Sequence, residues 1–344
     1  MDIRSRWYEI DVLKAFCILA VVYIHSLSTS ITPRHPVGEF LGHWTRFAVP
    51  GLLFAAGFLF RKSEIRSGRL SIKLVRRIVP PYLVWSLIIL ALGLSDTRPS
   101  LTRMSLGQVG YDLLTGHAVS IYYFIFLIGY LYTFSFLLRF CRKGFAWGLW
   151  LAFVLLTVLF YLNPFLFLPD YLYRLAPPKP EDFFFVVMRH PCVYAVFYLT
   201  GWVFSLSYAS IRGFLQRRAV AVLLLAAAAD IAALFALTRV SGFSPEQLLI
   251  QLHVVLAIVF LLVVGIIGLP LRPAVEFLSR NTYGVFLIHL PFVRGFQGLF
   301  PHVTWDFSAL HSIGAWSVGV AGSLLVIVLA RLAVGRYSSC LVGS

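Results

Sequence analysis

The feature that most constrains this chain is a series of long apolar runs, each about as long as a membrane-spanning helix. A helix needs about 20 mostly apolar residues to cross a hydrocarbon core of about 30 Å. Windows of that kind lie at residues 11–30, 42–60, 78–95, 119–138, 146–168, 190–208, 219–238, 248–268, 281–300 and 311–330. The sequence therefore predicts an all-α, polytopic membrane protein with about ten transmembrane helices, forming a single domain over residues 1–344.

The composition excludes several other classes of protein. Only 12% of the residues are charged, whereas a soluble globular protein has about 25%. So few ionisable groups could not cover a water-facing surface, which excludes a soluble enzyme, a disordered chain and a coiled coil. The first apolar run lacks a small-residue cleavage signature, so we expect a retained helix and not a cleaved signal. The four cysteines are far apart and predict neither a disulfide framework nor a zinc site.

The basic residues are distributed unequally when the loops between the ten runs are assigned to alternating sides. The chain has 29 Lys and Arg residues against 14 acids, a net charge of +15. The side that contains the N-terminus receives 19 of the 29, the other side receives 8, and Lys14 and Arg294 fall inside the runs. By the positive-inside rule the richer side is cytosolic. Both termini are therefore predicted to be cytosolic, and no nucleic acid partner is needed to explain the charge.

The first apolar run contains three ionisable residues, Asp11, Lys14 and His25. Such groups are costly in a bilayer and usually face a cavity or a partner. At 100° per residue all three share one helix face, while Lys14 and His25 lie about 16 Å apart along the axis. His25 suits general-base chemistry, although a hydrogen bond to a neighbouring helix would also explain it. Lys14 is equally explained as a residue that extends its ammonium to the membrane surface.

Two other polar residues interrupt the later runs. His289 lies in the ninth run together with Asn281, Tyr283 and Arg294, and an interhelical hydrogen bond is the simpler interpretation of it. Asp230 lies in the seventh run without an obvious partner, and we expect it to pair with a residue such as an arginine from another segment.

The segment at residues 61–77 holds seven basic residues and a single acid. Attraction to anionic lipid head groups explains such a segment, at about 1 kcal/mol per basic residue. A phosphate-binding rim at the mouth of a cavity explains it as well, since Arg and Lys bind phosphate oxygens through charge-assisted hydrogen bonds. Pro80 and Pro81 follow directly, and we expect them to begin the third helix because proline is tolerated at a helix start.

Six segments, taken in order, resemble the integral-membrane acyltransferase-3 family. They are RWYEIDVLKAFCILAVVYIHS, FAVPGLLFAAGFLF, KLVRRIVPPYLVWS, HAVSIYYFIFLIGYLY, VYAVFYLTGWVFS and FLSRNTYGVFLIHLPF. The resemblance extends from residue 7 to about residue 335 with the same ten-helix plan. The chain departs from the family pattern at three positions: Lys14 replaces an arginine, Lys73 begins what is usually R-x-x-R, and Ala56 replaces a serine.

The resemblance implies an O-acyltransferase that uses acyl-CoA as donor, with acetyl-CoA as the expected acyl-CoA. The implied acceptor is a hydroxyl of a cell-surface polysaccharide, glycolipid or lipid-linked sugar, in a bacterial-type inner membrane. It implies His25 and Asp11 as catalytic residues, with His25 either a general base or a transient acyl carrier, and no metal. The donor would contact Lys14, Arg69, Lys73, Arg76 and Arg77, and a weaker expectation places substrate near Tyr122, Tyr123 and His289.

A transporter or flippase for a lipid-linked or acidic sugar is the alternative. Its path could use the same polar face of the first helix. Transporters often carry paired, broken helices in their two halves, and no matching pair of Gly- or Pro-interrupted runs is evident. A sensor module is disfavoured because no soluble domain is attached. Thermal stabilisation by acetyl-CoA, absent with bare sugar, would distinguish the enzyme from the transporter.

Overall fold

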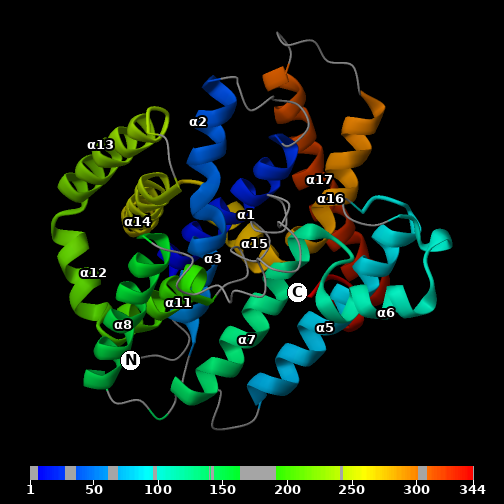
Figure 1. Ribbon diagram of the computed structural model, residues 1–344, viewed down its shortest axis with the longest axis horizontal. Helices are drawn as coiled ribbons and strands as arrows, with labels where there is room; N and C mark the ends of the chain where they lie inside the picture. Colours follow the sequence, from blue (N-terminus) through cyan, green and yellow to red (C-terminus); the bar gives the residue numbers. More distant parts are fainter. Residues whose placement is uncertain are drawn as a thin grey trace.

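The computed structural model describes residues 7–27, 36–60, 69–95, 99–138, 140, 143–162, 191–240, 243–300 and 308–343. Within these ranges every regular element is a helix (Figure 1). The longer helices are α1 (Tyr8–Leu27), α3 (Ala48–Leu59), α5 (Arg69–Ala91), α7 (Tyr123–Leu138), α8 (Lys143–Leu162), α11 (Pro191–Leu206), α13 (Ala219–Leu237), α14 (Phe243–Ile267), α16 (Thr282–Leu299) and α17 (Ser308–Val334). The shorter ones are α2 (Pro36–Trp44), η1 (Thr45–Phe47), η2 (Leu101–Arg103), α6 (Leu106–Thr115), η3 (Ser120–Tyr122), α12 (Tyr208–Arg217), α15 (Arg272–Arg280), η6 (Gly335–Ser338) and α18 (Ser339–Val342).

Each of the ten apolar windows coincides with one of the longer helices, so the all-α prediction is confirmed for the described residues. Five of the helices, α1, α8, α13, α14 and α17, are long and apolar enough to cross a membrane. The pair α6 and α7, bent by 48°, would make a sixth, and the segments Arg77–Ala91 and Tyr194–Leu206 are shorter apolar helices. The chain is thus a multi-pass membrane protein, while ten spans with cytosolic termini stay a prediction.

Helix α1 lies at the centre of the bundle and packs against α3, α14, α15, α16 and α17 (Figure 1). Nearly all of its apolar side chains are buried, which explains why its hydrophobic residues are not confined to one face. The neighbouring pair α3 and α11 is held especially close by two glycines. A Cβ atom on Gly57 would lie 1.9 Å from the carbonyl oxygen of Tyr198, and one on Gly201 would lie 2.0 Å from that of Phe54. Small residues allow such close backbone contact between membrane helices.

The contacts also give the relative direction of the helices. Trp7, at the start of α1, packs against Phe58, at the end of α3, with ring centroids 5.2 Å apart, so these helices are antiparallel. By contrast α1 and α16 run in the same direction. Lys14 contacts Ser279 just before α16. His25, farther along α1, contacts His289, which lies farther along α16.

The third helix begins earlier than the sequence suggested. Pro80 and Pro81 do not open it but lie inside α5, which starts at Arg69. Proline removes a backbone donor, and membrane helices tolerate this where neighbouring elements satisfy the freed groups. In α5 the missing N–H groups of Pro80 and Pro81 leave the carbonyls of Arg76 and Arg77 without their helical donors. On the next residue, the Tyr283 hydroxyl donates to the carbonyl of Ile78 at 2.8 Å. Contacts from α16 therefore support α5 beside the two prolines, which local helix propensity could not predict.

Candidate active site

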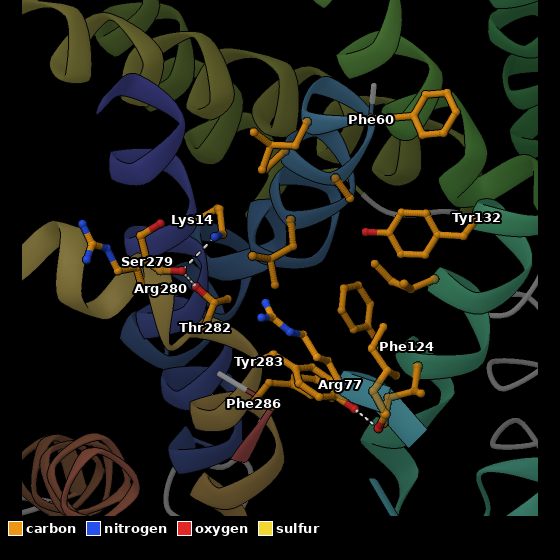
Figure 2. A pocket seen from close by; sticks show the side chains of 18 residues that line it. Lys14, Phe60, Arg77, Phe124, Tyr132, Ser279, Arg280, Thr282, Tyr283 and Phe286 are labelled. Atoms are coloured by element: carbon orange, nitrogen blue, oxygen red, sulfur yellow. Dashed lines mark hydrogen bonds between the residues drawn. The ribbon is translucent and has the colours of Figure 1, made fainter. Parts of the chain in front are cut away.

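A cavity of about 350 Å³ opens between α1, α3, α5, α7 and the α15–α16 segment (Figure 2). Its walls are mostly apolar and aromatic, with a few cationic and hydroxyl groups. They consist of Lys14, Leu52, Ala55, Ala56, Leu59, Phe60, Arg77, Ile78, Phe124, Ile125, Ile128, Tyr132, Ser279, Arg280, Thr282, Tyr283, Phe286 and Gly343. Cavities of roughly 300–1,000 Å³ with such walls and a few placed polar groups are typical of small-molecule sites.

Lys14 is fixed at the wall of this cavity by the junction between α15 and α16. Its ammonium donates to the carbonyl oxygen of Ser279 at 2.7 Å. The hydroxyl of Ser279 in turn donates to the Oδ1 atom of Asp11 at 2.6 Å. Ser279 and Asp11 are both buried, so Ser279 connects the Lys14 ammonium to a buried carboxylate on the preceding helical turn. This arrangement confirms that Asp11 and Lys14 face the same neighbouring segment.

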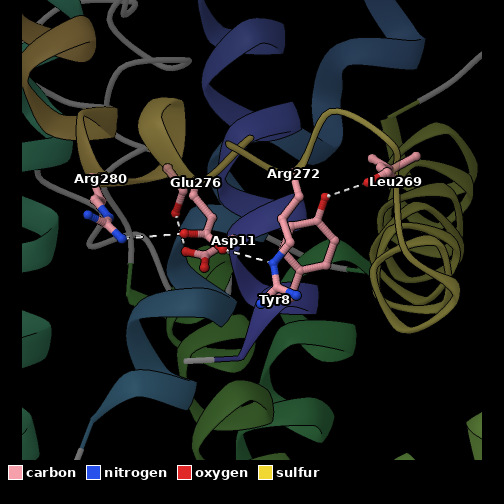
Figure 3. Close-up of polar contacts among 7 residues, drawn as sticks. Tyr8, Asp11, Leu269, Arg272, Glu276 and Arg280 are labelled. Carbon is pink, nitrogen blue, oxygen red and sulfur yellow. Dashed lines mark hydrogen bonds and ion pairs between the residues drawn. The ribbon is translucent and has the colours of Figure 1, made fainter. Parts of the chain in front are cut away.

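Two arginines line the cavity, but they are held differently. Arg77 projects among the lining side chains (Figure 2), and its side chain is exposed. Arg280 is turned towards α15 itself, where it pairs with Glu276 at 3.3 Å. Glu276 also pairs with Arg272 at 3.0 Å, and the Arg272 guanidinium lies 4.9 Å from the centre of the Tyr8 ring (Figure 3). Arg77 is therefore the described arginine that points most directly into the cavity.

His25 and His289 form a pair beyond the inner wall. Their ring centroids are 5.3 Å apart, with His25 half-buried and His289 fully buried. The ring of Phe286 lines the cavity and lies 6.4 Å from the His289 ring. Phe124 packs on the other side of Phe286 at 5.2 Å. One layer of aromatic rings thus separates the cavity from the histidine pair.

The structure places Asp11 and His25 far apart. Helix α1 is continuous between them, and fourteen residues at 1.5 Å each span about 21 Å. Asp11 belongs with Lys14 and Ser279, so it cannot contact a substrate atom held by His25. The contacts of the three residues agree with one shared helix face, while the catalytic roles expected of Asp11 and His25 stay predictions.

Tyr122 and Tyr123 lie in the α7 region with different surroundings. Tyr122 is fully buried, and its hydroxyl donates to the carbonyl oxygen of Leu287 at 3.0 Å. This contact uses the hydroxyl for packing of α16 close to His289. Tyr123 is partly buried. Neither residue is among those that line the cavity.

Three of the expected donor contacts cannot be placed at the cavity. Arg69, Lys73 and Arg76 belong to the first turns of α5, but their side chains lie outside the described residues. Residues 61–68, the rest of the basic segment, lie outside the described ranges as well. The role of these residues therefore stays a prediction, and Arg77 is the member of the basic segment that the described side chains place at the cavity.

Several residues at the site were not singled out by the sequence. Ser279 links Asp11 and Lys14, and Phe286 and Tyr132 form cavity walls. A serine or an aromatic residue is common in membrane helices, so no sequence signal marked these positions. The expected arginine partner of Asp230 was wrong: its Oδ1 atom lies 2.6 Å from Nδ1 of His253. His253 is about three turns along α14 and carries no spacing signal that relates it to Asp230.

The chain was compared with known proteins. Residues 7–332 match the family model described as an acyltransferase domain of the acyltransferase-3 type. Comparison with curated proteins and with solved structures gave no significant match. The match covers nearly all the described helices, from Trp7 at the start of α1 into the last turn of α17.

Proposed function

Because this chain belongs to the acyltransferase-3 family and is an acyltransferase, we propose that it transfers an acyl group from acyl-CoA to a sugar hydroxyl. The donor is acetyl-CoA in the simplest case. The acceptor is a hydroxyl of a cell-surface polysaccharide, a glycolipid or a lipid-linked sugar. The observation that carries the proposal is a largely apolar cavity with Lys14 and Arg77 in its wall and a histidine pair behind its aromatic end.

The cationic groups suit the phosphates of coenzyme A. Ammonium and guanidinium groups bind phosphate oxygens through charge-assisted hydrogen bonds. Arg77 projects into the cavity and Lys14 is held at its wall, while Arg69, Lys73 and Arg76 belong to the same helix as Arg77. We expect the nucleotide end of the donor to remain at this mouth, in contact with Arg77 and the basic turns that precede it.

The apolar part of the cavity suits the long, thin arm that carries the thioester. Lys14 and His25 lie about 16 Å apart along α1, so an extended arm is needed to connect a phosphate near one with a reacting carbonyl near the other. The walls along this direction are contributed by Ile125, Ile128 and Phe286. The thioester would pass the Phe286 ring to reach His25, which makes this ring the inner boundary of the donor site.

The chemical step then requires a base at the hydroxyl of the acceptor. His25 removes the hydroxyl proton as the oxygen attacks the thioester carbonyl. The carbon–sulfur bond breaks, the new ester forms, and the coenzyme A thiolate leaves with a proton returned from the imidazolium. One acyl group and one proton have moved, so the atoms and charges balance. Asp11 has a supporting role in this scheme, since it holds Ser279 and thereby the carbonyl that binds Lys14.

The site also suggests how the two substrates reach each other. The donor would enter from the basic side of the bundle, which we expect to face the cytosol of a bacterial-type inner membrane. The acceptor would approach His25 from the opposite end of α1, which we expect to face membrane lipid or the outer side. This arrangement favours an acyl transfer whose donor and acceptor occupy different ends of one path.

Purified protein in lipid nanodiscs provides the test. Acetyl-CoA should raise the thermal unfolding temperature, and incubation with a cell-envelope glycan fraction should release free thiol and add acetyl mass to the glycan. A coenzyme A analogue that lacks the phosphate groups is the control ligand and should not stabilise the protein. Absence of stabilisation by every acyl-CoA tested, together with no thiol release, would exclude this donor class.

A further inference from the structure

His289 is a buried polar residue of α16 that lies beside the ring of His25. Its side chain is fully buried in α16, and its Nδ1 atom lies 3.0 Å from the carbonyl oxygen of Val285, one turn earlier. Its Nε2 atom is also buried and has no hydrogen-bond partner among the described residues. Buried polar atoms are nearly always satisfied, so such an atom calls for an explanation.

The hydrogen bond to Val285 fixes which nitrogen of the neutral ring carries hydrogen. A carbonyl oxygen can only accept, so Nδ1 must be the donor. In a neutral imidazole the other nitrogen then presents a lone pair. Nε2 of His289 is therefore a hydrogen-bond acceptor in a buried place, and the ring beside it is that of His25, with centroids 5.3 Å apart and planes inclined by 38°.

The position of His289 is held from two sides. The helical bond to Val285 sets its ring within α16. The hydroxyl of Tyr122 bonds to the carbonyl of Leu287, two residues before His289, and anchors that turn to the α7 region. His25 is half-buried, whereas His289 lies behind it and fully buried. A substrate can thus reach His25 without contacting His289.

From this geometry we infer that His289 is a positioning residue for the reaction: during the reaction the His25 ring turns so that one of its ring nitrogens donates a hydrogen bond to the Nε2 atom of His289, which has no partner in the described part of the chain. This inference rests on the proposed function, in which His25 is the general base. With one nitrogen of His25 donating to His289, the other nitrogen of His25 carries the lone pair, and this lone pair faces the acceptor hydroxyl. When that nitrogen takes the hydroxyl proton, both nitrogens of His25 carry hydrogen, and His289 stabilises the resulting imidazolium without itself changing protonation.

The assignment differs from the usual explanation of a histidine in a membrane helix. An interhelical hydrogen bond of purely structural value would engage both ring nitrogens or leave the second one exposed. Here the structural bond is made within α16 itself, to Val285, and the second nitrogen is left for a neighbour that is needed in the reaction. The inference also replaces the expectation that His289 contacts substrate directly.

Two substitutions separate the two nitrogens of His289. The amide of His289→Asn can still donate to Val285 but has no atom near the place of Nε2. The amide of His289→Gln reaches the place of Nε2 and offers an acceptor there, but it loses the group at Nδ1. Both variants are neutral and of similar size, so they form a matched pair.

The experiment measures acetyl transfer from acetyl-CoA in nanodiscs for the wild type and both variants, with thermal stabilisation by coenzyme A as the control for folding and donor binding. We expect His289→Asn to lower kcat on the order of 100-fold with an unchanged KM for acetyl-CoA, and His289→Gln to recover most of the rate. In the His25→Ala background, His289→Asn should cause no further loss, since coupled residues are not additive.

Other outcomes overturn the inference. Equal rates for His289→Asn and the wild type would show that Nε2 is not used. Equal losses in both variants, or an additive loss in the His25→Ala background, would show that His289 only supports packing. If the wild type itself transfers no acyl group from any acyl-CoA, the proposed function fails instead, and the two failures are thereby distinguished.

Discussion

Two buried histidines in different parts of the bundle have opposite surroundings. His253 in α14 has a partner at each ring nitrogen: Asp230 of α13 lies 2.6 Å from Nδ1, and the carbonyl oxygen of Trp44 lies 3.0 Å from Nε2. The Nδ1 atom of His289 in α16 bonds to the carbonyl of Val285 on its own helix. Its second nitrogen lies beside the ring of His25 and has no partner in the described part of the chain.

The difference indicates two kinds of role. His253 joins three elements, α2, α13 and α14, and its hydrogen-bonding capacity is used entirely in that connection. A satisfied buried network of this kind fixes the packing. In the His289 region the Nε2 atom of His289 has no partner in the described part of the chain. It belongs to a ring that lies next to the half-buried His25 and to Phe286, which lines the cavity. We therefore expect substitutions around His253 to change stability and substitutions around His25 to change rate.

The largest effect should follow from His25→Ala. Loss of a general base lowers the rate by about 10²- to 10⁴-fold, so acyl transfer should fall to near background. Because Lys14 and Arg77 are untouched, thermal stabilisation by coenzyme A should remain. The measurement is acetyl transfer per folded molecule in nanodiscs. A purified, folded variant with normal transfer would remove the proposed base.

Asp230→Ala should have the next largest effect, but on stability. Removing one partner of a buried pair costs about 3 kcal/mol because the other polar group is left unsatisfied. Thermal or denaturant unfolding in detergent should show this loss, while kcat of the folded fraction stays near that of the wild type. Asp230→Asn keeps an oxygen acceptor for His253 and should lose less. A fall in kcat without loss of stability would contradict the division between the two regions.

Arg77→Gln tests the donor end of the cavity. Loss of one charge-assisted contact to phosphate should raise KM for acetyl-CoA about tenfold with little change in kcat, a difference of about 1.4 kcal/mol. Added salt should reduce the difference between variant and wild type, because salt screens such contacts. Arg239→Gln is the matched control, since Arg239 lies over the Phe235 ring in another part of the bundle. Equal changes in both variants would indicate a general effect of charge.

Ser279→Ala should give the smallest effect. It removes the hydrogen bond to Asp11 but keeps the carbonyl that binds Lys14. We expect a loss of about 1 kcal/mol in the free energy of unfolding and a KM for acetyl-CoA close to that of the wild type. Unfolding and steady-state kinetics on the same preparation would measure both. A large rise in KM would show that the Asp11 contact, and not the backbone carbonyl, holds Lys14.

Much of this arrangement could be predicted because membrane helices are regular. The shared face of Asp11, Lys14 and His25 follows from 100° per residue, and their contacts confirm it: Asp11 and Lys14 contact Ser279, and His25 contacts His289. The start of α5 was less predictable, because proline suggests a boundary locally, whereas the helix includes both prolines and is contacted beside them by the Tyr283 hydroxyl of α16.

The partners across helices could not be predicted in the same way. Asp230 finds His253 and not an arginine, and Asp11 finds Ser279. Nothing in the spacing of these residues relates them, since each pair lies on different segments. Hydrophobic burial is non-directional, so apolar runs specify that helices pack without specifying which polar side chains meet.

The sequence by itself determined the apolar helices, the membrane class, the acyltransferase family and the polar face of the first helix, because each of these depends on the local pattern of residues along the chain. The tertiary structure alone decided that α16 lies parallel to α1, that Lys14 borders a cavity, and that His25 lies beside His289. These features depend on distances between segments more than 250 residues apart, and such distances are set by packing and not by local pattern.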